Sequence, residues 1–342
     1  MQINFIIFFI IFGLSFVFLC RKFDLIVDYK LEKHKRFSSK SKSNSIGGIL
    51  LSSFFVYQFL IGTLNNLLFF LLAFILIIGF MSDIKKLNSV RLRFAAQVLL
   101  IISFITFLDF RIYETKIDFV NQLLQNNFIN IIFVTFCLMV LMNGSNFIDG
   151  LNGLLIKYFL IVYLVIFYKF SNLANVDSVF LVNLIIILSL LLFLNLFGFI
   201  YMGDSGAYML SLFTGIYLII FFNTNSSISP YLAILLLWYP CFELLFSMIR
   251  RSRQKLKAYK PDNYHLHQFI YKQIKKKMSS NSDLLAHFFT SFLINSYNLI
   301  IFIISLNYIY NSEILILILV INIALYLLIY SFFKKKYYLS KL

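Results

Sequence analysis

The sequence predicts an all-α integral membrane protein, a bundle of helices that crosses the bilayer many times. Hydrophobic residues make up 61% of the 342-residue chain, and charged residues only 13%. The apolar residues form continuous runs, whereas a membrane barrel would show short strands in which apolar and polar residues alternate. The basic residues, which give a net charge of +16, cluster between these runs. A soluble globular protein is excluded by this composition, whose mean hydropathy is +0.88.

Apolar runs of roughly 20 residues give about eleven membrane spans. Their expected positions are 3–20, 46–62, 65–81, 94–109, 128–142, 154–170, 177–200, 207–222, 229–248, 285–306 and 313–333. The first run has no basic stretch before it and no small-residue cleavage site, so a retained helix is expected instead of a removed signal peptide. The three cysteines fall inside apolar runs and imply neither a disulfide framework nor a metal site. We find no internal repeat and expect one membrane domain over 1–342.

Nearly all of the 30 basic residues fall in alternate connections, on one predicted side of the membrane. Cytoplasmic loops of membrane proteins are enriched in Lys and Arg, so the amino terminus is predicted outside and the carboxyl terminus in the cytoplasm. Membrane topology and contact with anionic membrane lipids explain the charge, so no nucleic-acid partner is predicted. The connections concerned are 21–45, 84–93, 249–284 and the segment after residue 333.

The connection 21–45 is rich in Lys and Ser and is predicted to be a mobile cytoplasmic loop. It leads to Gly47 and Gly48, which are predicted to allow close helix packing or a kink where the second span begins.

The third span ends at Asp83, which is followed by Lys85 and Lys86. An acidic residue here is typical of a solvated span boundary, but it would also suit a proton acceptor or a group that supports a metal ligand. Arg91 and Arg93 then open the fourth span, where they could extend to the membrane surface or hold a lipid phosphate.

A polar stretch between two apolar runs, residues 143–153, holds three asparagines, one aspartate and three glycines. Unpaired polar groups resist desolvation at a membrane boundary, so such a segment is costly unless it has a function. On a helical turn Asn143, Asn146 and Asp149 would share one face, because they are spaced three residues apart. Oxygen ligands on one face suit a hard cation or a phosphorylated substrate. The alternative is a polar turn.

A second polar stretch begins at Asn195, within the seventh span, and ends in Gly203-Asp204-Ser205-Gly206. It offers a carboxylate, a hydroxyl and free backbone amides, which together suit a metal and a phosphate. The glycines let the backbone turn and approach a ligand closely. The charge pattern places this stretch on the same side as the first, and a simple turn is again the alternative.

The longest cytoplasmic connection carries Arg250 and Arg251, then Asp262, His265 and His267. Two histidines two residues apart could bind a transition metal, but no cysteine or second histidine pair is near, so a zinc site is not expected. A histidine pair beside a carboxylate and many basic residues better suits the binding of a diphosphate or the positioning of a substrate.

The last two spans are predicted to be scaffold helices, covering about 285–333, because they carry no evident polar constellation. His287, just inside the first of them, is expected to pack or to extend to the surface. No charged residue stands out near the middle of any span.

The candidate residues gather on the predicted cytoplasmic side of the membrane. They describe a site for a metal-bound phosphorylated substrate, since phosphoryl transfer needs in-line positioning and a cation that neutralises the phosphate oxygens. A lipid phosphate would enter sideways between helices, which explains a site at the ends of spans. The residues are Asp83, Asn146, Asp149, Asp204, His265 and His267.

Four motifs occur together in a pattern that resembles the polyprenyl-phosphate N-acetylhexosamine-1-phosphate transferases, glycosyltransferase family 4. This family includes the initiators of O-antigen and teichoic acid and the translocase that makes lipid I. The resemblance covers about residues 21–270, the expected catalytic region, and includes the helix arrangement. The motifs are Gly79-x-x-x-Asp83, Asn143-x-x-Asn146-x-x-Asp149-Gly-Leu-x-Gly153, Met202-Gly203-Asp204-Ser205-Gly206 and Pro261-Asp262-x-x-His265-Leu266-His267.

The resemblance implies that a sugar-1-phosphate moves from a UDP-N-acetylhexosamine to undecaprenyl phosphate and that UMP is released. It implies Mg²⁺, or Mn²⁺ in its place, on Asn146 and Asp204. It further implies that Asp83 helps the attack of the lipid phosphate, that Asp149 supports the nucleotide or metal site, and that His265 and His267 contact the diphosphate or sugar. Together with Asp204, these residues form the expected catalytic set. The expected substrate-binding residues are Asn143, Asn146, Asn195, Gly203, Arg250, Arg251 and Asp262.

The resemblance also implies a multi-pass protein of the bacterial inner membrane with a cytoplasmic active site. Such a protein would serve the biogenesis of O-antigen, lipopolysaccharide or another cell-wall glycan. UDP-GlcNAc or a 6-deoxy relative would be the donor, and a homodimer remains open.

Three positions depart from the family pattern, where Ser82 and Asn152 replace aspartates and Gln268 replaces a histidine. A serine cannot act as a carboxylate base at neutral pH, although a lipid phosphate is already largely ionised. These departures leave open a catalytically lapsed relative that acts as a binding or scaffold protein. A secondary transporter is a further alternative, in which polar residues would lie nearer the middle of the membrane.

Overall fold

The computed structural model describes residues 2–23, 45–255, 262–278 and 283–339, and within them every regular element is an α-helix. Pro261 of the histidine motif and most of the connection 21–45 lie outside the described residues. The helices are α1 (Gln2–Lys22), α2 (Gly47–Leu60), α3 (Asn66–Asp83), α4 (Val90–Leu108), α5 (Asp118–Leu124), α6 (Asn127–Ile148), α7 (Leu154–Phe170), α8 (Ser178–Leu196), α9 (Gly203–Thr224), α10 (Tyr231–Arg253), α11 (Leu266–Lys277), α12 (Asp283–Leu306) and α13 (Ser312–Leu339).

The predicted fold class is confirmed, because each predicted span falls on a helix. In the described part of the chain, 8 helices are long and apolar enough to cross a membrane. The remaining three predicted spans lie on α1, α2 and α7, of which α2 has 14 residues and α7 has 17. The number of spans that cross the bilayer, and their orientation, stay predictions.

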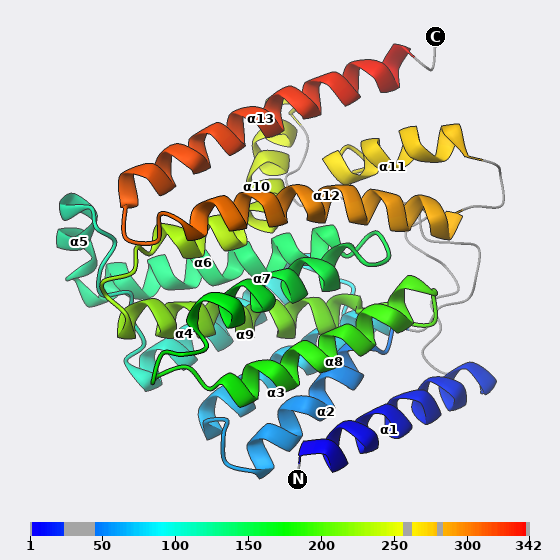
Figure 1. The fold of residues 1–342 in the computed structure, drawn as a ribbon, viewed down its shortest axis with the longest axis horizontal. Coiled ribbons are helices and arrows are strands. Elements are labelled where there is room, and N and C mark those ends of the chain that lie inside the picture. The colour runs from blue at the N-terminus through cyan, green and yellow to red at the C-terminus, as the bar shows by residue number, and fades with distance from the viewer. Residues whose placement is uncertain (1, 24–44, 256–261, 279–282, 340–342) are drawn as a thin grey trace.

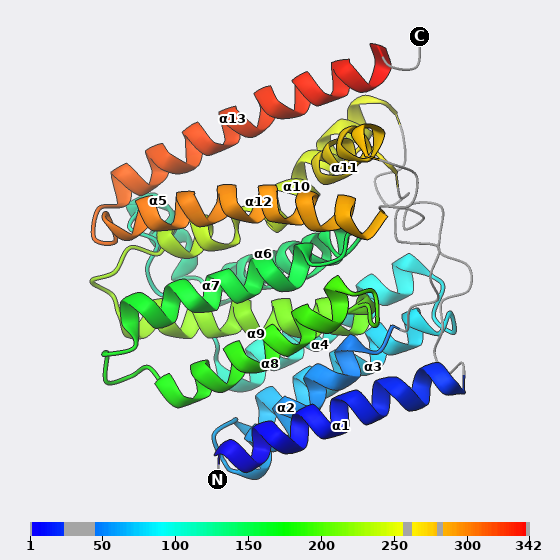
Figure 2. The same ribbon diagram turned by 45° about the vertical axis from the view of Figure 1, so that its right-hand side comes forward.

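Helix α9 lies inside the bundle, and 83% of its most apolar stretch is buried. It packs against α2, α3 and α6. Figures 1 and 2 show α1 and α13 at opposite edges of the bundle, with α9 between them. A helix that is apolar on all sides is expected in such a place, since neighbouring helices instead of lipid surround it.

Glycines bring α2 and α3 against the first turn of α9. A Cβ added to Gly79 would lie 2.4 Å from Ser205 Cα, and one on Gly48 would lie 2.5 Å from the backbone nitrogen of Gly206. The N–H of Gly47 donates to the Tyr201 carbonyl oxygen at 2.9 Å. The predicted close packing at Gly47 and Gly48 is therefore confirmed, and small residues allow it as they do in other membrane bundles.

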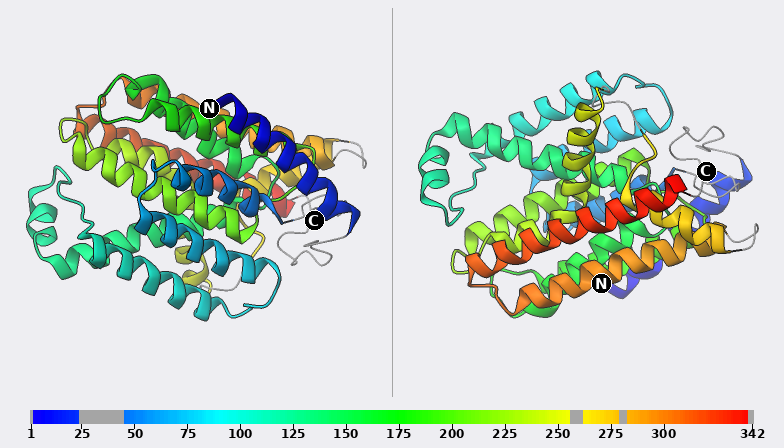
Figure 3. Two further views of the ribbon diagram at one scale, coloured as in Figure 1. Left: turned by 90° about the horizontal axis from the view of Figure 1, so that it is seen from below. Right: turned by 90° about the horizontal axis from the view of Figure 1, so that it is seen from above.

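Helix α10 contains Pro240, which lacks the N–H that would bond to the carbonyl of Leu236. The hydroxyl of Tyr158, from α7, donates to that carbonyl oxygen at 2.8 Å and so replaces the missing donor. Gly144 of α6 allows the approach of α10, because a Cβ there would lie 2.2 Å from the Pro240 carbonyl oxygen. Figure 3 shows part of α10 crossing the neighbouring helices steeply, as expected beside an internal proline.

The expectation that the last two spans carry no polar constellation is wrong. Trp238 of α10 donates to Asn298 of α12 at 2.7 Å, and Asn295 of α12 donates to the Leu154 carbonyl oxygen at 3.2 Å. The polar positions repeat every three or four residues and form one buried face of α12, which joins it to α7 and α10. The buried polar residues of α12 are His287, Thr290, Ser291, Asn295, Asn298 and Ser305.

Candidate active site

The first polar stretch continues α6 as a helix to Ile148 and then turns. Asn143 and Asn146 are therefore on a helical face, and the polar-turn alternative holds only from Asp149 onward. Asn146 donates to the hydroxyl of Tyr208 at 3.2 Å, and its Oδ1 is buried without a hydrogen-bond partner among the described residues. Asn143 donates back to the Met139 carbonyl oxygen of its own helix at 3.0 Å.

Asn195 joins the two polar stretches. Its side-chain Oδ1 accepts the N–H of Gly153 at 2.5 Å, and its side-chain Nδ2 donates to the Ile200 carbonyl oxygen at 2.8 Å. Gly153 has a φ of 78°, and a Cβ at this residue would lie 2.6 Å from Leu196. Asn195 was predicted to bind substrate, but both ends of its amide are used inside the protein, so it positions the turn after α6 against the segment before α9.

Two carboxylates bind the free backbone N–H groups at the start of α9. Asp83 accepts the N–H of Asp204 at 2.8 Å through Oδ1, and the N–H and Oγ of Ser205 at 3.1 and 2.7 Å through Oδ2. Asp149 accepts the N–H of Gly203 at 3.1 Å. Gly203 has a φ of 70°, and a Cβ there would lie 2.6 Å from Asp83 Oδ2. The first turn of a helix has unpaired donors and a positive dipole end, so both carboxylates are stabilised there.

Asp204 lies on the first turn of α9, is 5% exposed and contacts two side chains that come from α3 and α4. Ser82 Oγ donates to Asp204 Oδ2 at 2.6 Å, and Arg93 Nη1 lies 2.7 Å from the same oxygen. Arg93 also contacts Ser82 Oγ. The predicted membrane-surface arginine is thus an ion-pair partner of the site, a role that its place at the start of a span did not reveal.

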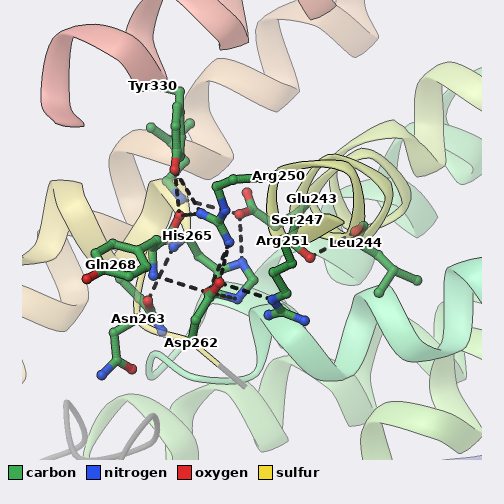
Figure 4. A network of polar contacts seen from close by, with 12 residues as sticks. Glu243, Leu244, Ser247, Arg250, Arg251, Asp262, Asn263, His265, Gln268 and Tyr330 are labelled. Carbon is green, nitrogen blue, oxygen red and sulfur yellow. Dashed lines mark hydrogen bonds and ion pairs between the residues drawn. The ribbon is translucent and has the colours of Figure 1, made fainter. Parts of the chain in front are cut away.

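The histidine motif forms a network with the end of α10, shown in Figure 4. Arg250 holds both carboxylate oxygens of Asp262, at 3.0 and 2.8 Å, and Arg251 donates to Asp262 at 3.0 Å. Arg250 also donates to the Tyr330 hydroxyl of α13 at 2.8 Å and contacts the Tyr264 carbonyl oxygen. Charge-assisted bonds to arginine are strong and directional, so these residues fix the loop.

Asp262 titrates below the ordinary aspartate range. Burial alone would raise its pKa, but the hydrogen bond from Arg251 and the nearby charges of His265 and Arg250 lower the pKa by more. The expected substrate binders Arg250, Arg251 and Asp262 are therefore paired with one another in this structure. Their observed contacts hold the loop that carries the histidines.

The two histidines stack, with ring centroids 5.4 Å apart and ring planes inclined by 11°. Burial lowers the pKa of His267 to about 3, so its ring is neutral at pH 7. Neither of its ring nitrogens has a hydrogen-bond partner in the described part of the chain. A Cβ on Gly150 would lie 3.9 Å from His267 Nε2, and Phe147 meets the His265 ring edge-on at 5.3 Å. The structure thus brings the histidine motif to the turn after α6.

Of the departures from the family pattern, Ser82 and Gln268 have side-chain partners, whereas the side chain of Asn152 is buried without a hydrogen-bond partner among the described residues. Gln268 Oε1 accepts the N–H of His265 at 3.3 Å and so caps the start of α11. The N–H of Asn152 donates to His287 Nδ1 at 3.2 Å, and the His287 ring packs 4.8 Å from the ring of Tyr271. His287 is fully buried, so the predicted packing role is confirmed and extension to the surface is excluded.

Sequence reasoning missed Glu243, a carboxylate inside α10 that is 1% exposed. It accepts from His265 Nδ1 at 2.9 Å and from the Tyr326 hydroxyl of α13 at 2.7 Å. An acidic residue inside an apolar span marks a functional-site candidate, and this signal was present in the sequence. The expectation that no charged residue stands out near the middle of a span is therefore wrong for α10, where Glu243 lies near the middle of the helix.

The predicted cation can be tested against the donor groups of the site. In the described ranges, no three or more His, Cys, Asp or Glu side chains form a group that could hold a metal. Mg²⁺ at phosphoryl-transfer sites is held by one or two carboxylates together with substrate phosphates and water. Asp204 offers a carboxylate, and Asn146 Oδ1 is a buried oxygen without a partner among the described residues. Each of these two oxygen donors is of the type that suits a hard cation.

Comparison with known proteins agrees with the motifs. The sequence model of glycosyl transferase family 4 matches residues 65–222. This segment runs from the start of α3 to the end of α9, so it contains Asp83, Asn146, Asp149 and Asp204, whereas the histidine motif lies beyond it. No curated protein matches the chain. The match over residues 65–222 and the apolar helices support a multi-pass membrane protein with a glycosyl- or phosphotransferase kind of function.

Proposed function

We propose that this protein transfers a sugar-1-phosphate from a UDP-N-acetylhexosamine to undecaprenyl phosphate and releases UMP. One observation carries the proposal. Asp83, Asp149 and Asp204 gather at the first turn of α9, inside the segment that matches glycosyl transferase family 4. The placement of this reaction at the cytoplasmic face of a bacterial inner membrane is part of the proposal and rests on the distribution of basic residues.

In the proposed reaction, an oxygen of the lipid phosphate attacks the β-phosphorus of the UDP-sugar. A new phosphorus–oxygen bond forms, the bond to the bridging oxygen breaks, and that oxygen leaves with UMP. The lipid phosphate is largely ionised at neutral pH, so the attacking oxygen needs no proton removed. Catalysis then depends on positioning and on neutralising the phosphate oxygens.

Asp204 and Asn146 would hold Mg²⁺, with Mn²⁺ as an alternative, and the bound cation would neutralise charge on the donor diphosphate. Asp149 would keep the metal-bearing turn of α9 against the end of α6, through its bond to Gly203. Asp83 has both carboxylate oxygens bonded to α9, so we assign it a positioning role in place of the expected help in the attack.

We assign the acceptor phosphate to Arg93, because it is a partly exposed arginine beside Asp204. Its side chain is 19% exposed, and Nη1 is the guanidinium nitrogen that contacts Asp204 and Ser82. An arginine fork binds phosphate through more than one nitrogen. In the proposed complex Arg93 would hold the lipid phosphate beside Asp204.

A second candidate, a lapsed relative that binds a UDP-sugar without transferring it, is favoured by the same contacts. Asp204 is paired with Arg93 instead of standing free for a cation, and Ser82 replaces a carboxylate of the family pattern. Such a protein would still bind the UDP-sugar but would release UMP slowly or not at all.

The test uses the purified protein in lipid nanodiscs with undecaprenyl phosphate, Mg²⁺ and a panel of UDP-N-acetylhexosamines, and it measures UMP release. We expect UMP that depends on lipid, on the cation and on Asp204, so Asp204→Asn should lower the rate by about 100-fold or more. Binding of a UDP-sugar by calorimetry without UMP would support the lapsed relative. Absence of both binding and UMP would overturn the proposal.

A further inference from the structure

Glu243 is a buried carboxylate whose two oxygens face different partners. Oε1 accepts from His265 Nδ1 at 2.9 Å and from the Leu266 N–H at 3.3 Å, while Oε2 accepts from the Tyr326 hydroxyl at 2.7 Å. A carboxylate inside a protein is costly unless several donors compensate for its lost hydration. The donors around Glu243 come from the start of α11 and from α13, so the residue joins α10 to both helices.

The ring of His265 lies between Glu243 and the candidate active site. Its Nε2 is 3.6 Å from Asp262 Oδ1, and one ring face stacks on His267. Its edge meets Phe147, two residues before Asp149 at the end of α6. The Nδ1 side of the ring therefore faces Glu243 in the protein interior, whereas the rest of the ring lies against Asp262, His267 and Phe147.

A carboxylate only accepts hydrogen bonds, so a proton stays on the Nδ1 that faces it whether the imidazole is neutral or charged. Nε2 is then the nitrogen that can exchange a proton or bond to a ligand. We infer that Glu243 is a positioning residue, which fixes the ring orientation and the Nδ1–H form of His265 so that Nε2 serves the donor diphosphate. This inference rests on the proposed function.

The first experiment reads the tautomer directly and needs no turnover. The chain has four histidines, so ¹⁵N-histidine NMR spectra of the protein in nanodiscs can be assigned with single substitutions. Spectra are recorded at pH 8.5, above the ordinary histidine pKa of about 6.5. We expect the Nδ1–H form of His265 in the wild type. An Nε2–H ring in the wild type would overturn the inference without any variant.

Variants then separate the hydrogen bond from other effects. Glu243→Met removes the acceptor at similar volume and should let the Nε2–H form of His265 appear. Glu243→Gln keeps an acceptor oxygen and should retain the Nδ1–H form. Tyr326→Phe is the matched control, because it removes a partner of Glu243 but leaves the bond to His265. An unchanged tautomer in Glu243→Met would contradict the inference.

The second experiment measures kinetics of UMP release with the active donor. Loss of a residue that orients a functional group typically lowers activity by about 10- to 100-fold. Glu243→Met should therefore lower kcat by about 10- to 100-fold, while KM for the UDP-sugar changes less than about twofold. Tyr326→Phe should stay within about threefold of wild-type kcat. A changed tautomer together with full turnover would overturn the positioning role.

A negative result for the proposed function can be distinguished from a negative result for the inference about Glu243. If the wild type releases no UMP with any donor but binds a UDP-sugar, the proposed transfer reaction fails, and the tautomer spectra still decide whether Glu243 sets the form of His265. If UMP is released and the tautomer in Glu243→Met is unchanged, the inference about Glu243 fails and the proposed function stands.

Discussion

Arg93, at the start of α4, forms an ion pair with Asp204, at the start of α9, with Nη1 and Oδ2 2.7 Å apart. The two side chains are 19% and 7% exposed, so water screens the pair only in part. Ser82 donates to the same carboxylate oxygen. The residue proposed to hold the cation is thus balanced by a cation of the protein itself, which gives the first two predictions.

Replacing Arg93 by Met should destabilise the protein. The variant leaves a largely buried Asp204 without its charged partner, which we expect to cost about 1–3 kcal/mol of unfolding free energy. Thermal unfolding in detergent measures the effect. Arg91→Met is the control, because Arg91 lies at the same helix start but is exposed, and it should change stability by less than about 0.5 kcal/mol. Equal effects of the two substitutions would contradict the role of the ion pair.

Replacing Ser82 by Asp should strengthen cation binding. The new carboxylate would lie beside Asp204, and one more nearby charge is worth about 1 kcal/mol, or about fivefold in affinity. Titration with Mn²⁺, followed by electron paramagnetic resonance, measures the change without requiring activity. Ser82→Ala removes the hydrogen bond without adding charge and should not tighten binding. If Ser82→Ala and Ser82→Asp behave alike, charge is not the cause.

Acid should destabilise the protein through His267. Its pKa is about 3 in the folded protein against the ordinary 6.5, because burial opposes the charged form. As pH falls below about 6.5, the unfolded chain takes up a proton that the folded chain refuses, so stability falls by up to about 1.4 kcal/mol per pH unit until about pH 3. Above pH 6.5 this residue contributes no pH dependence.

The measurement is the free energy of unfolding of the wild type and of His267→Phe between pH 4 and 7.5. Phenylalanine keeps a ring against His265 but cannot take up a proton, so the variant should show a smaller decline toward acid. Parallel curves for the two proteins would show that another group causes the acid sensitivity.

Gly79→Ala should disturb the contact between α3 and α9. The added Cβ would lie 2.4 Å from Ser205 Cα, a backbone atom that cannot move aside cheaply, so we expect a loss of about 1–3 kcal/mol and a shift of the first turn of α9. UMP release should fall with it, since that turn carries Asp204. Gly13→Ala is the control, because its nearest added contact is a leucine side-chain carbon at 3.9 Å. Equal stability of both variants would contradict the close contact.

The helices could be predicted from the sequence because a bilayer leaves a long apolar run few alternatives. Backbone polar groups in hydrocarbon must bond within the segment, so a run of roughly 20 apolar residues is helical. The same local reasoning placed Asn143 and Asn146 on one helical face and expected small-residue packing at Gly48, and the structure agrees on both points.

The partners of the polar groups could not be predicted in this way. Asp83 bonds to the backbone N–H of Asp204, 121 positions away. Glu243 bonds to His265, a residue that the sequence marked as a candidate without showing its partner. Such contacts depend on which helices pack together. Glu243 is a single carboxylate in an apolar span, so the sequence alone could have identified it as a candidate functional residue.

The sequence by itself determined that the chain is a helical membrane bundle and which short stretches are polar enough to form a site. Only the tertiary structure decided that Asp83 and Asp149 bind the start of α9, that Arg93 pairs with Asp204, and that the arginines of α10 hold the histidine loop. The physical reason is one of range. Hydrophobicity and helical spacing act between near neighbours in the chain, whereas ion pairs and caps form between helices that glycine contacts bring together.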